Sequence, residues 1–314
     1  MQVAHQLETI RRKASNFLAR GIAYQYFQRR APVGCDVMTE DWDNLYLLDA
    51  CRYDMFADQN QLSGTLDSRI SKGPTTPEFL EANFANQTHY DTIYVTANPI
   101  HAADGWCSVA LENVFHEVID VWKDGWDEEL GTVPPEVMTE SVLDAAARHP
   151  NKRLFAHFIQ PHHPFIGASG RSLIDRGWDS RAYALDTPSD SDNPTVGKIW
   201  DRLEEGLITT DRVWQAYTEN LDLVWPHLEK LFAEIDGKTV VTSDHGNLVG
   251  ERLWPFPRRG YGHPHGLYAP KLIKVPWLIC DGSQRREIVP ELPSDGERQA
   301  SSDVVRRLTS LGYT

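Results

Sequence analysis

Cysteine is scarce in this chain of 314 residues, and its spacing argues against two kinds of structure. The four cysteines are far apart and form no Cys-x-x-Cys pair: Cys35, Cys51, Cys107 and Cys280. Cysteine-based zinc sites typically contain such pairs, and dense disulfide frameworks need more cysteines in a shorter stretch of chain. We therefore predict a reduced protein that uses neither device.

Long apolar runs are also absent. No segment approaches the roughly 20 residues that a membrane-spanning helix requires, and the first residues lack the apolar core and cleavage site of a secretory signal. Yet 41% of the residues are hydrophobic, which is enough to bury the core of one large domain. These features favour a cytoplasmic protein, peripheral to a membrane at most.

Basic residues are fewer than acidic ones, 31 against 45, which gives a net charge of −14. Nucleic-acid binding depends on clustered lysine and arginine. We therefore expect no nucleic-acid partner.

Residues 1–30 are the exception to this acidic balance and are predicted to form a basic helical N-terminal extension. Their only acidic residue is Glu8, and their basic residues are Arg11, Arg12, Lys13, Arg20, Arg29 and Arg30. A helix packed on the rest of the protein, with its basic side in water, is the favoured interpretation. The alternative is an amphipathic helix that lies on an anionic membrane.

Residues 31–314 are predicted to form a single α/β domain. Five segments have the apolar and β-branched composition of buried strands: residues 44–49, 92–96, 153–159, 239–242 and 277–280. Helical patterns separate them, and alternating strands and helices favour a three-layer sandwich, in which a mostly parallel central sheet has helices on both faces. Apolar residues spaced by three and four from Trp214 to Ile235 predict the clearest helix, which Pro226 should kink or split.

Residues 167–198 interrupt this order with a segment rich in Ser, Asp, Gly and Pro. Because strand-like segments lie on both sides, we interpret it as a surface insertion and not as a domain linker. Its place after a histidine pair suits a substrate lid, although a disordered acidic loop explains the composition equally well.

Polar residues follow two of the predicted strands where open α/β sheets place their chemistry. Residues 239–247 read TVVTSDHGN, so Asp244, His245 and Gly246 follow the strand directly, and Asp49 ends the strand at residues 44–49. Carboxylate and imidazole groups are good ligands for divalent cations. Without a cation, clustered carboxylates would repel each other.

A turn at residues 72–80 (KGPTTPEFL) is predicted to open a helix. A helix N-terminus favours incoming phosphate or sulfate, so Thr75 or Thr76 could be a metal-activated nucleophile. Local sequence alone favours the simpler interpretation that one threonine caps the helix and Pro77 lies in its first turn.

Two histidine pairs lie in turns late in the chain, and such clusters favour metal or anion binding. They are His162 with His163, in Pro-His-His-Pro, and His263 with His265, in Gly-His-Pro-His-Gly.

The order of these motifs resembles the alkaline phosphatase superfamily, particularly its sulfatase-like branch. The matching segments are LYLLDACRYD at residues 45–54, residues 73–80, HFIQPHHPF at 157–165, TVVTSDHGN at 239–247 and YGHPHGLYAPKLIKVPWL at 261–278. The resemblance spans most of residues 40–280. It implies an alkaline phosphatase-like sheet, one or two divalent metal ions (Zn, Mn, Mg or Ca) and in-line attack on a phosphate or sulfate ester.

The resemblance also implies roles for individual residues. Asp49, Asp244 and His245 match the ligands of the metal that binds the nucleophile. Thr75 matches the nucleophile by its spacing to Pro77, whereas Thr76 does so if the match shifts by one residue.

Further residues match the anion-binding part of the family's site. His162 and His263 are assigned to metal, and His163 and His265 to substrate, although each pair could exchange these roles. Arg52 and Asn98 could contact substrate oxygens, with a structural ion pair and a turn as their alternatives.

The chain departs from the family's sulfatases at the nucleophile. Enzymes that use formylglycine need Cys or Ser two positions before the proline and Arg two positions after it, whereas this chain has threonine and Phe79. We therefore predict a metal-dependent hydrolase or transferase that acts on a small anionic ester, with phosphate mono- or diesters ahead of sulfate esters. The alternative is a non-catalytic metal- or anion-binding protein that keeps the fold.

Overall fold

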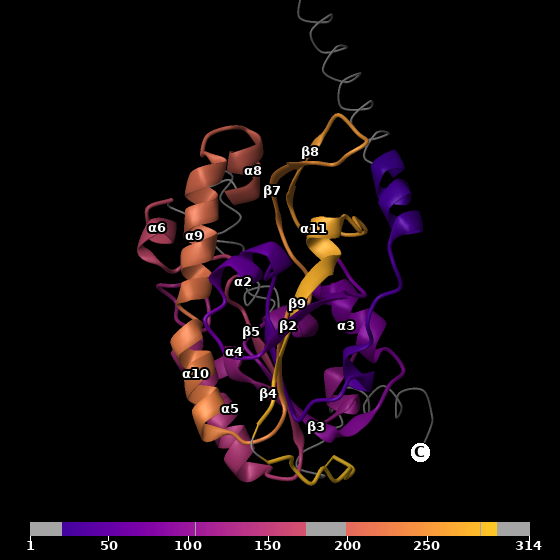
Figure 1. Cartoon of the computed structure of the whole chain (residues 1–314), viewed down its shortest axis with the longest axis vertical. Coiled ribbons are helices and arrows are strands. Elements are labelled where there is room, and N and C mark those ends of the chain that lie inside the picture. The colour runs from indigo at the N-terminus through magenta and orange to yellow at the C-terminus, as the bar shows by residue number, and fades with distance from the viewer. Residues whose placement is uncertain (1–20, 104, 174–198, 283, 294–314) are drawn as a thin grey trace, which may run out of the picture.

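A seven-stranded sheet runs through the centre of the computed structural model, which describes residues 21–103, 105–173, 199–282 and 284–293 (Figure 1). In spatial order its strands are β2 (Thr65–Ile70), β9 (Lys274–Cys280), β6 (Thr239–Thr242), β1 (Asn44–Leu48), β5 (Arg153–Phe158), β3 (His89–Thr96) and β4 (Phe115–Asp120). The five strands from β6 to β4 are parallel, and β9 runs antiparallel to both β6 and β2. The predicted mostly parallel sheet is confirmed.

All five strands expected from the sequence are present, but two strands of the sheet were not expected. The additional strands, β2 and β4, are its two edges. Most of their residues are only partly buried, and their sequences TLDSRI and FHEVID mix charged and apolar residues. An edge strand that faces water does not need the apolar composition that marks a central strand.

Alternation along the central strands creates two hydrophobic layers. On β1, Leu45 and Leu47 belong to the same cluster as Phe155 of β5, whereas Tyr46 and Leu48 belong to the opposite one. The first layer lies under α3 (Thr76–Phe84) and the short helices η1 (Val37–Thr39), η2 (Pro99–Ala102) and η3 (Leu111–Asn113). The second lies under α5 (Pro135–Arg148), α9 (Thr210–Asp222) and α10 (Trp225–Glu234), which lie together on one side of the sheet (Figure 1). These layers complete the three-layer sandwich.

The long helix predicted up to Ile235 is divided in two. Helix α9 ends at Asp222 and α10 begins at Trp225, with Pro226 in the first turn of α10. Proline lacks the amide that a continuous helix would need there, but it is well tolerated in a first helical turn. The predicted effect of Pro226 is therefore confirmed.

The remaining elements gather around one end of the sheet. They are α2 (Tyr53–Gln59), α4 (Val121–Asp124), α6 (Ala168–Arg171), α8 (Ile199–Glu204), α11 (Pro270–Ile273) and a two-stranded sheet of β7 (Leu248–Arg252) and β8 (Arg259–Gly262). Of the predicted insertion, residues 174–198 lie outside the described residues. Helix α6 follows Gly167, and Glu219 of α9 accepts hydrogen bonds from the backbone of Ala168 and Ser169.

Residues 21–30 are helical, and residues 1–20 of the predicted extension lie outside the described residues. Phe27 is buried in a small cluster with Leu248, Leu253 and Leu267. Every helix within the described ranges is too short or too polar to cross a lipid bilayer. All four cysteines are free thiols. The cytoplasmic location stays a prediction.

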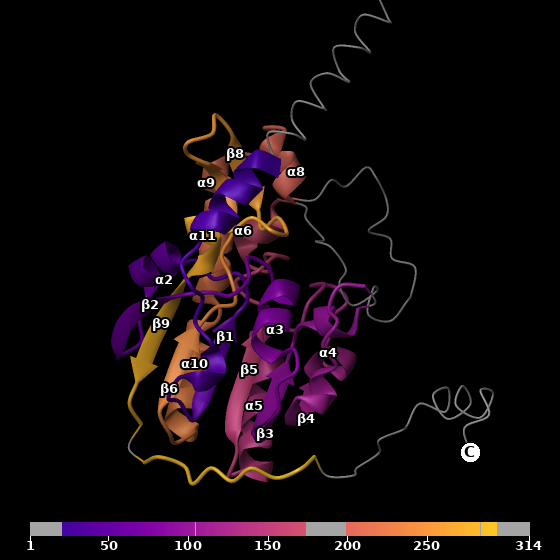
Figure 2. The same ribbon diagram turned by 90° about the vertical axis from the view of Figure 1, so that its right-hand side faces the viewer.

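Residues 284–293 lie along the end of the sheet opposite β7 and β8 (Figure 2). The amide of Val289 donates to the carbonyl of Asn151 at 3.0 Å, and the buried Lys152 forms an ion pair with Glu291 at 2.7 Å. Leu292 nevertheless stays 76% exposed.

Phe84 tests the packing of the first layer. Its buried ring contacts the rings of Phe79, Tyr94, Phe115 and Phe155. Phe84→Ala should lower the free energy of unfolding by about 3–5 kcal/mol, because the cavity adds to the lost burial. Urea titration measures this change. Leu292→Ala, at an exposed position, is the control and should change it by less than about 0.5 kcal/mol.

Candidate metal centre and active site

Three buried side chains converge at the carboxyl ends of neighbouring parallel strands. Asp49 follows β1, His157 lies in β5 and Asp244 follows β6, and one potential ligand atom from each lies within 4.8 Å of the others. Because β1 pairs with both β5 and β6 in parallel, these strand ends meet at one place. The predicted meeting of Asp49 and Asp244 is therefore seen in the structure.

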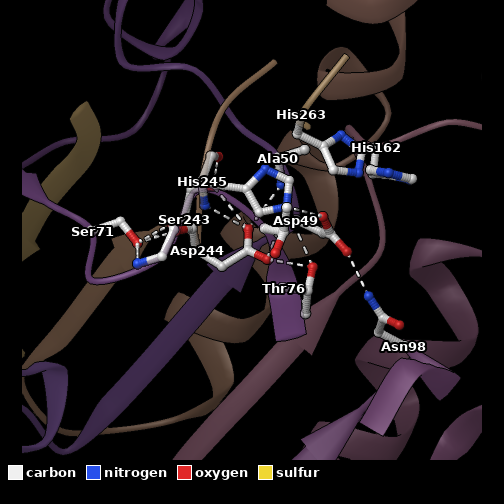
Figure 3. A network of polar contacts seen from close by, with 12 residues as sticks. Asp49, Ala50, Ser71, Thr76, Asn98, His162, Ser243, Asp244, His245 and His263 are labelled. Atoms are coloured by element: carbon white, nitrogen blue, oxygen red, sulfur yellow. Dashed lines mark hydrogen bonds and ion pairs between the residues drawn. The ribbon is translucent and has the colours of Figure 1, made fainter. Parts of the chain in front are cut away.

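Asp244 is held by hydrogen bonds on both carboxylate oxygens. Oδ1 accepts from the backbone amides of Ala50 at 2.9 Å and His245 at 2.8 Å. Oδ2 accepts from the Thr76 hydroxyl at 2.7 Å (Figure 3). Ala50 has a positive φ of 58°, a conformation that brings its amide to the carboxylate.

The two candidate threonines differ in what their hydroxyls contact. Thr75 is the N-cap of α3: its hydroxyl accepts from the Glu78 amide and donates to the Glu78 carboxylate at 2.8 Å. Thr76, the first residue of the helix, points at Asp244, and its oxygen lies 3.4 Å from Nε2 of His245 (Figure 3). The capping function falls to Thr75, and Thr76 is the threonine at the carboxylates.

The pKa values of Asp49 and Asp244 are shifted in opposite directions. Burial, together with the charge of Asp244, raises the pKa of Asp49 well above its ordinary value. Burial would also raise the pKa of Asp244, but the bonds from Ala50 and Thr76, and the imidazoles of His245 and His157 in their protonated forms, lower it overall. Without a cation, the protein thus shifts Asp244 towards its charged form and Asp49 towards its neutral form.

His157 is suited to ligate a metal. Burial lowers its pKa to about 4, so the imidazole is neutral at neutral pH, as a metal ligand must be. Its Nδ1 lies 2.7 Å from the Tyr94 hydroxyl oxygen. When Nδ1 carries the proton and donates to this oxygen, Nε2 keeps its lone pair, and Nε2 is the atom 3.9 Å from Asp49.

Two atoms of this group lack a hydrogen-bond partner although they are buried. They are Oδ1 of Asp49 and Nε2 of His157. Buried polar atoms are rarely left unsatisfied, and a divalent cation would bind both. A set of carboxylate oxygens with imidazole nitrogen suits zinc or manganese. The residues present therefore fit the metal that the sequence predicts.

The later histidines lie on the far side of His245 from the strand ends. The ring centroid of His263 is 4.6 Å from that of His245 and 5.1 Å from that of His162 (Figure 3). Burial and the neighbouring His245 lower the pKa of His162 to about 4 and that of His263 well below its ordinary value. Both imidazoles are therefore neutral at neutral pH.

The other histidines of the two pairs are more distant. The ring of His163 packs beside that of His162, with centroids 4.2 Å apart, and on its other side meets Trp200 at 5.9 Å. The side chain of His265 is 80% exposed and pairs with Glu78 at 3.3 Å. His265 is thus linked to the site only through the helix that carries Thr76.

Arg52 and Asn98 contact protein groups in this structure. The buried Arg52 guanidinium is held by Asp54, at 2.7 Å, and by Glu251. The Asn98 amide donates to Oδ2 of Asp49 at 2.6 Å while its oxygen caps η2 (Figure 3). Arg52 thus forms the structural ion pair that was its alternative, and Asn98 orients the Asp49 carboxylate. Their contacts with substrate stay predictions.

Two residues of the site carried no role in the sequence. His157 lies inside an apolar strand, two residues after Phe155, and alternation along a strand places both side chains on the face that α3 covers. This alternation was the only sequence signal that could have pointed to His157. Asn220 lies in α9, where its buried amide donates to the carbonyls of Pro161 and His162 at 3.2 and 3.0 Å. It fixes the turn that carries the histidine pair, and no sequence motif marks it.

Gly246 has a steric role beside the site. A Cβ atom at this position would lie 2.3 Å from the carbonyl oxygen of Lys271. Its amide donates to the carbonyl of Leu272 at 2.8 Å. The absence of a side chain lets the turn after His245 pack directly against α11.

No family model and no curated protein matches the chain. Among solved structures, it resembles the lipooligosaccharide phosphoethanolamine transferase A of Neisseria meningitidis, with 12% identity, a TM-score of 0.43, and coverage of 84% of this chain and 55% of the other. The zinc complex of the C-terminal periplasmic domain of EcEptC from Escherichia coli has 13% identity, a TM-score of 0.45, and coverage of 80% and 77%. The lipoteichoic acid synthase LtaP of Listeria monocytogenes has 11% identity, a TM-score of 0.42, and coverage of 84% and 72%.

The resemblance to the sulfatase-like branch of the alkaline phosphatase superfamily rests on the sequence motifs. The chain spans little more than half of the neisserial transferase. At identities and TM-scores of this size, the reactions of these proteins are not assigned to this chain.

Asp49→Asn tests the electrostatics of the site. Because the pKa of Asp49 is raised in the folded protein, Asp49 should contribute a loss of stability to the metal-free protein as the pH rises above the ordinary value of 3.8, opposite in sign to the gain from the buried histidines, whose pKa values are lowered. Asparagine carries no charge, so this loss should be smaller in the variant. Divalent cation should stabilise the wild type but not the variant. Thermal unfolding with chelator or with added Mn²⁺ or Zn²⁺, at several pH values, measures both effects.

The control for this experiment is Asp58→Asn, which removes an exposed carboxylate from α2. It should leave both the pH dependence and the stabilisation by metal unchanged. Identical pH profiles for the wild type and Asp49→Asn would show that the pKa of Asp49 is not raised by folding. Equal stabilisation of the two proteins by metal would show that Asp49 is not a ligand.

Proposed function

We propose that this chain is a metal-dependent enzyme that cleaves or transfers phosphate esters, with Thr76 as its nucleophile. The observation that carries the proposal is the Thr76 hydroxyl, 2.7 Å from Asp244 and at the edge of a buried group of two aspartates and a histidine. A hydroxyl held in this way is positioned and also has a base beside it.

The residues around Thr76 suit the binding of a tetrahedral anion. Thr76 begins a nine-residue helix, whose N-terminus has a positive electrostatic potential. The imidazoles of His162 and His263 lie beyond His245, and Nδ1 of each contacts a protein oxygen, on His163 and Asn247 respectively. In the neutral rings Nδ1 therefore carries the proton and Nε2 keeps its lone pair, which would suit a second metal ion that grips the ester. A divalent cation held by Asp49, His157, Asp244 and His245 would neutralise the carboxylates and stabilise charge developing on the ester.

The residues divide the reaction into two parts. Thr76 Oγ would bond to phosphorus as its proton passes to Asp244, and the ester's alcohol would leave and take a proton from solvent. The threonine ester would then be broken by water, which gives hydrolysis, or by a second alcohol, which gives transfer. Asn98 would keep Asp49 oriented throughout, and Asn220 would hold the histidine turn.

Phosphate is favoured over sulfate by the nucleophile itself. The sulfatases in the family that the motifs resemble form their nucleophile from cysteine or serine, whereas Thr76 and Thr75 precede Pro77 here. A sulfate ester remains the second candidate substrate because the same anion-binding groups suit it.

Paired alanine substitutions of the two threonines test the proposal. Thr76→Ala should lower kcat/KM by about a thousandfold or more, because no nucleophile remains. Removal of the nucleophile from other enzymes causes losses of at least this order. Thr75→Ala should keep turnover and cost about 1 kcal/mol of stability through loss of the cap. Suitable substrates are p-nitrophenyl phosphate, bis-p-nitrophenyl phosphate and p-nitrophenyl sulfate, each with Mn²⁺, Zn²⁺, Mg²⁺ and Ca²⁺.

Metal binding separates the outcomes of this experiment. Thr76→Ala should retain metal, whereas Asp244→Asn should lose both metal and turnover. Full activity of Thr76→Ala with loss of activity in Thr75→Ala would contradict the assignment of the nucleophile. Tight metal binding without turnover of any substrate would instead indicate a binding protein that has kept the site.

A further inference from the structure

Helix 21–30 and the β7–β8 hairpin form one surface at the end of the molecule near α8, which we call the hairpin face (Figures 1 and 2). The two elements are joined by aromatic packing. Phe256, in the hairpin loop, meets Tyr26 edge to face at a centroid distance of 5.3 Å and lies 6.3 Å from Phe27. The hairpin face is therefore a continuous surface from two distant parts of the sequence.

Apolar side chains project into solvent from both elements of this face. Trp254 is 76% exposed in the hairpin loop, two residues from Phe256, and Ile22 is 61% exposed on the helix, one turn before Tyr26. The Arg30 guanidinium lies over the Tyr26 ring at 4.1 Å. The face thus presents tryptophan and isoleucine with arginine beside them.

The charge of the hairpin face is opposite to that of the whole protein. Residues 21–30 and 248–262 contain five arginines and a single carboxylate, Glu251, which pairs with Arg52, in a chain with a net charge of −14. Arg252 and Arg259 are exposed and directly opposite each other in the hairpin. Among the described residues, no carboxylate forms an ion pair with either of them. Like charges opposite each other destabilise a strand pair, and an external anion would remove this cost.

We propose that the hairpin face docks on an anionic lipid bilayer. Tryptophan favours the boundary between lipid and water, and arginine binds lipid phosphates. Charge complementarity favours this partner over a second copy of the chain, because a symmetric contact would bring the arginines of both copies together. Basic residues at positions 11, 12, 13 and 20 add to the positive charge of the chain ahead of the helix.

A cavity of about 470 Å³ is lined by residues of both elements of the hairpin face and of α8. Tyr24, Trp200, Tyr261 and Arg259 line it, together with Asp201 and Glu204 of α8. The Trp200 ring is also 5.9 Å from that of His163. If the proposed function holds, docking would bring lipid-borne phosphate esters to this cavity. The docking itself does not depend on the reaction.

Co-sedimentation of the full chain with lipid vesicles tests the proposal. The chain should bind vesicles of phosphatidylcholine with about one-third phosphatidylglycerol, and not vesicles of phosphatidylcholine alone. Trp254→Ala and the double variant Arg252→Gln, Arg259→Gln should each lower the partition coefficient, the double variant by about tenfold or more. Binding should also weaken at high salt, since it depends on exposed charges.

Two matched controls keep the test specific. Leu292→Ala removes a side chain that is also 76% exposed, at the opposite end of the molecule. Arg148→Gln with Lys230→Gln removes two exposed positive charges from α5 and α10. Both controls should bind vesicles like the wild type. Thermal unfolding verifies that every variant is folded.

Three results would overturn the proposal. They are no preference for anionic vesicles, unchanged binding of both hairpin variants, and a dimer in sedimentation that Trp254→Ala dissociates. Asp244→Asn should bind vesicles normally while losing metal. A wild-type chain that turns over p-nitrophenyl substrates but does not bind anionic vesicles would contradict this inference alone, and a wild-type chain that binds vesicles without turnover would contradict the proposed function alone.

Discussion

The burial of two carboxyl groups side by side is the constraint on which the rest of the site depends. Asp49 and Asp244 are 1% and 0% exposed at the ends of adjacent parallel strands. Burying charge is unfavourable unless it is paired or hydrogen-bonded. The chain meets this cost with the Asn98 amide, two backbone amides and the Thr76 hydroxyl, and it leaves one oxygen of Asp49 without a partner. A divalent cation would bind this oxygen and neutralise the charge of the two carboxyl groups.

The architecture of the sheet explains why a threonine is available at this point. Alternation along β5 places His157 on the same face as Phe155, and α3 covers that face. The helix therefore begins beside the strand ends, with its first residue directed at Asp244. Thr75 caps the helix through Glu78 and leaves Thr76 for the carboxylates. Helix capping and the proposed catalysis thus use neighbouring residues of one turn.

The sequence predicted the central strands and the positions of Asp49 and Asp244 at the ends of two of them. An apolar, β-branched run followed by a carboxylate is a pattern that can be read from local sequence. The spacing to Pro77 favoured Thr75 over Thr76 as the nucleophile, but the direction of each hydroxyl depends on where α3 lies over the sheet. His157 has the pattern of a strand residue, and only the pairing of β5 with β1 shows which groups it meets. Edge strands β2 and β4 were missed because a half-exposed strand keeps few apolar residues. Tertiary contact, absent from local sequence, accounts for each of these differences.

The central claim is that Thr76 becomes covalently attached to the transferred group. The most direct measurement is peptide mass spectrometry after the metal-loaded protein is mixed with a phosphate ester and quenched in acid within one turnover. We expect the added mass of one phosphoryl group on the peptide from α3, with fragments that place it on Thr76 and no addition to the Thr76→Ala variant. Turnover without any modified peptide, or a phosphoryl group on Thr75, would contradict the account.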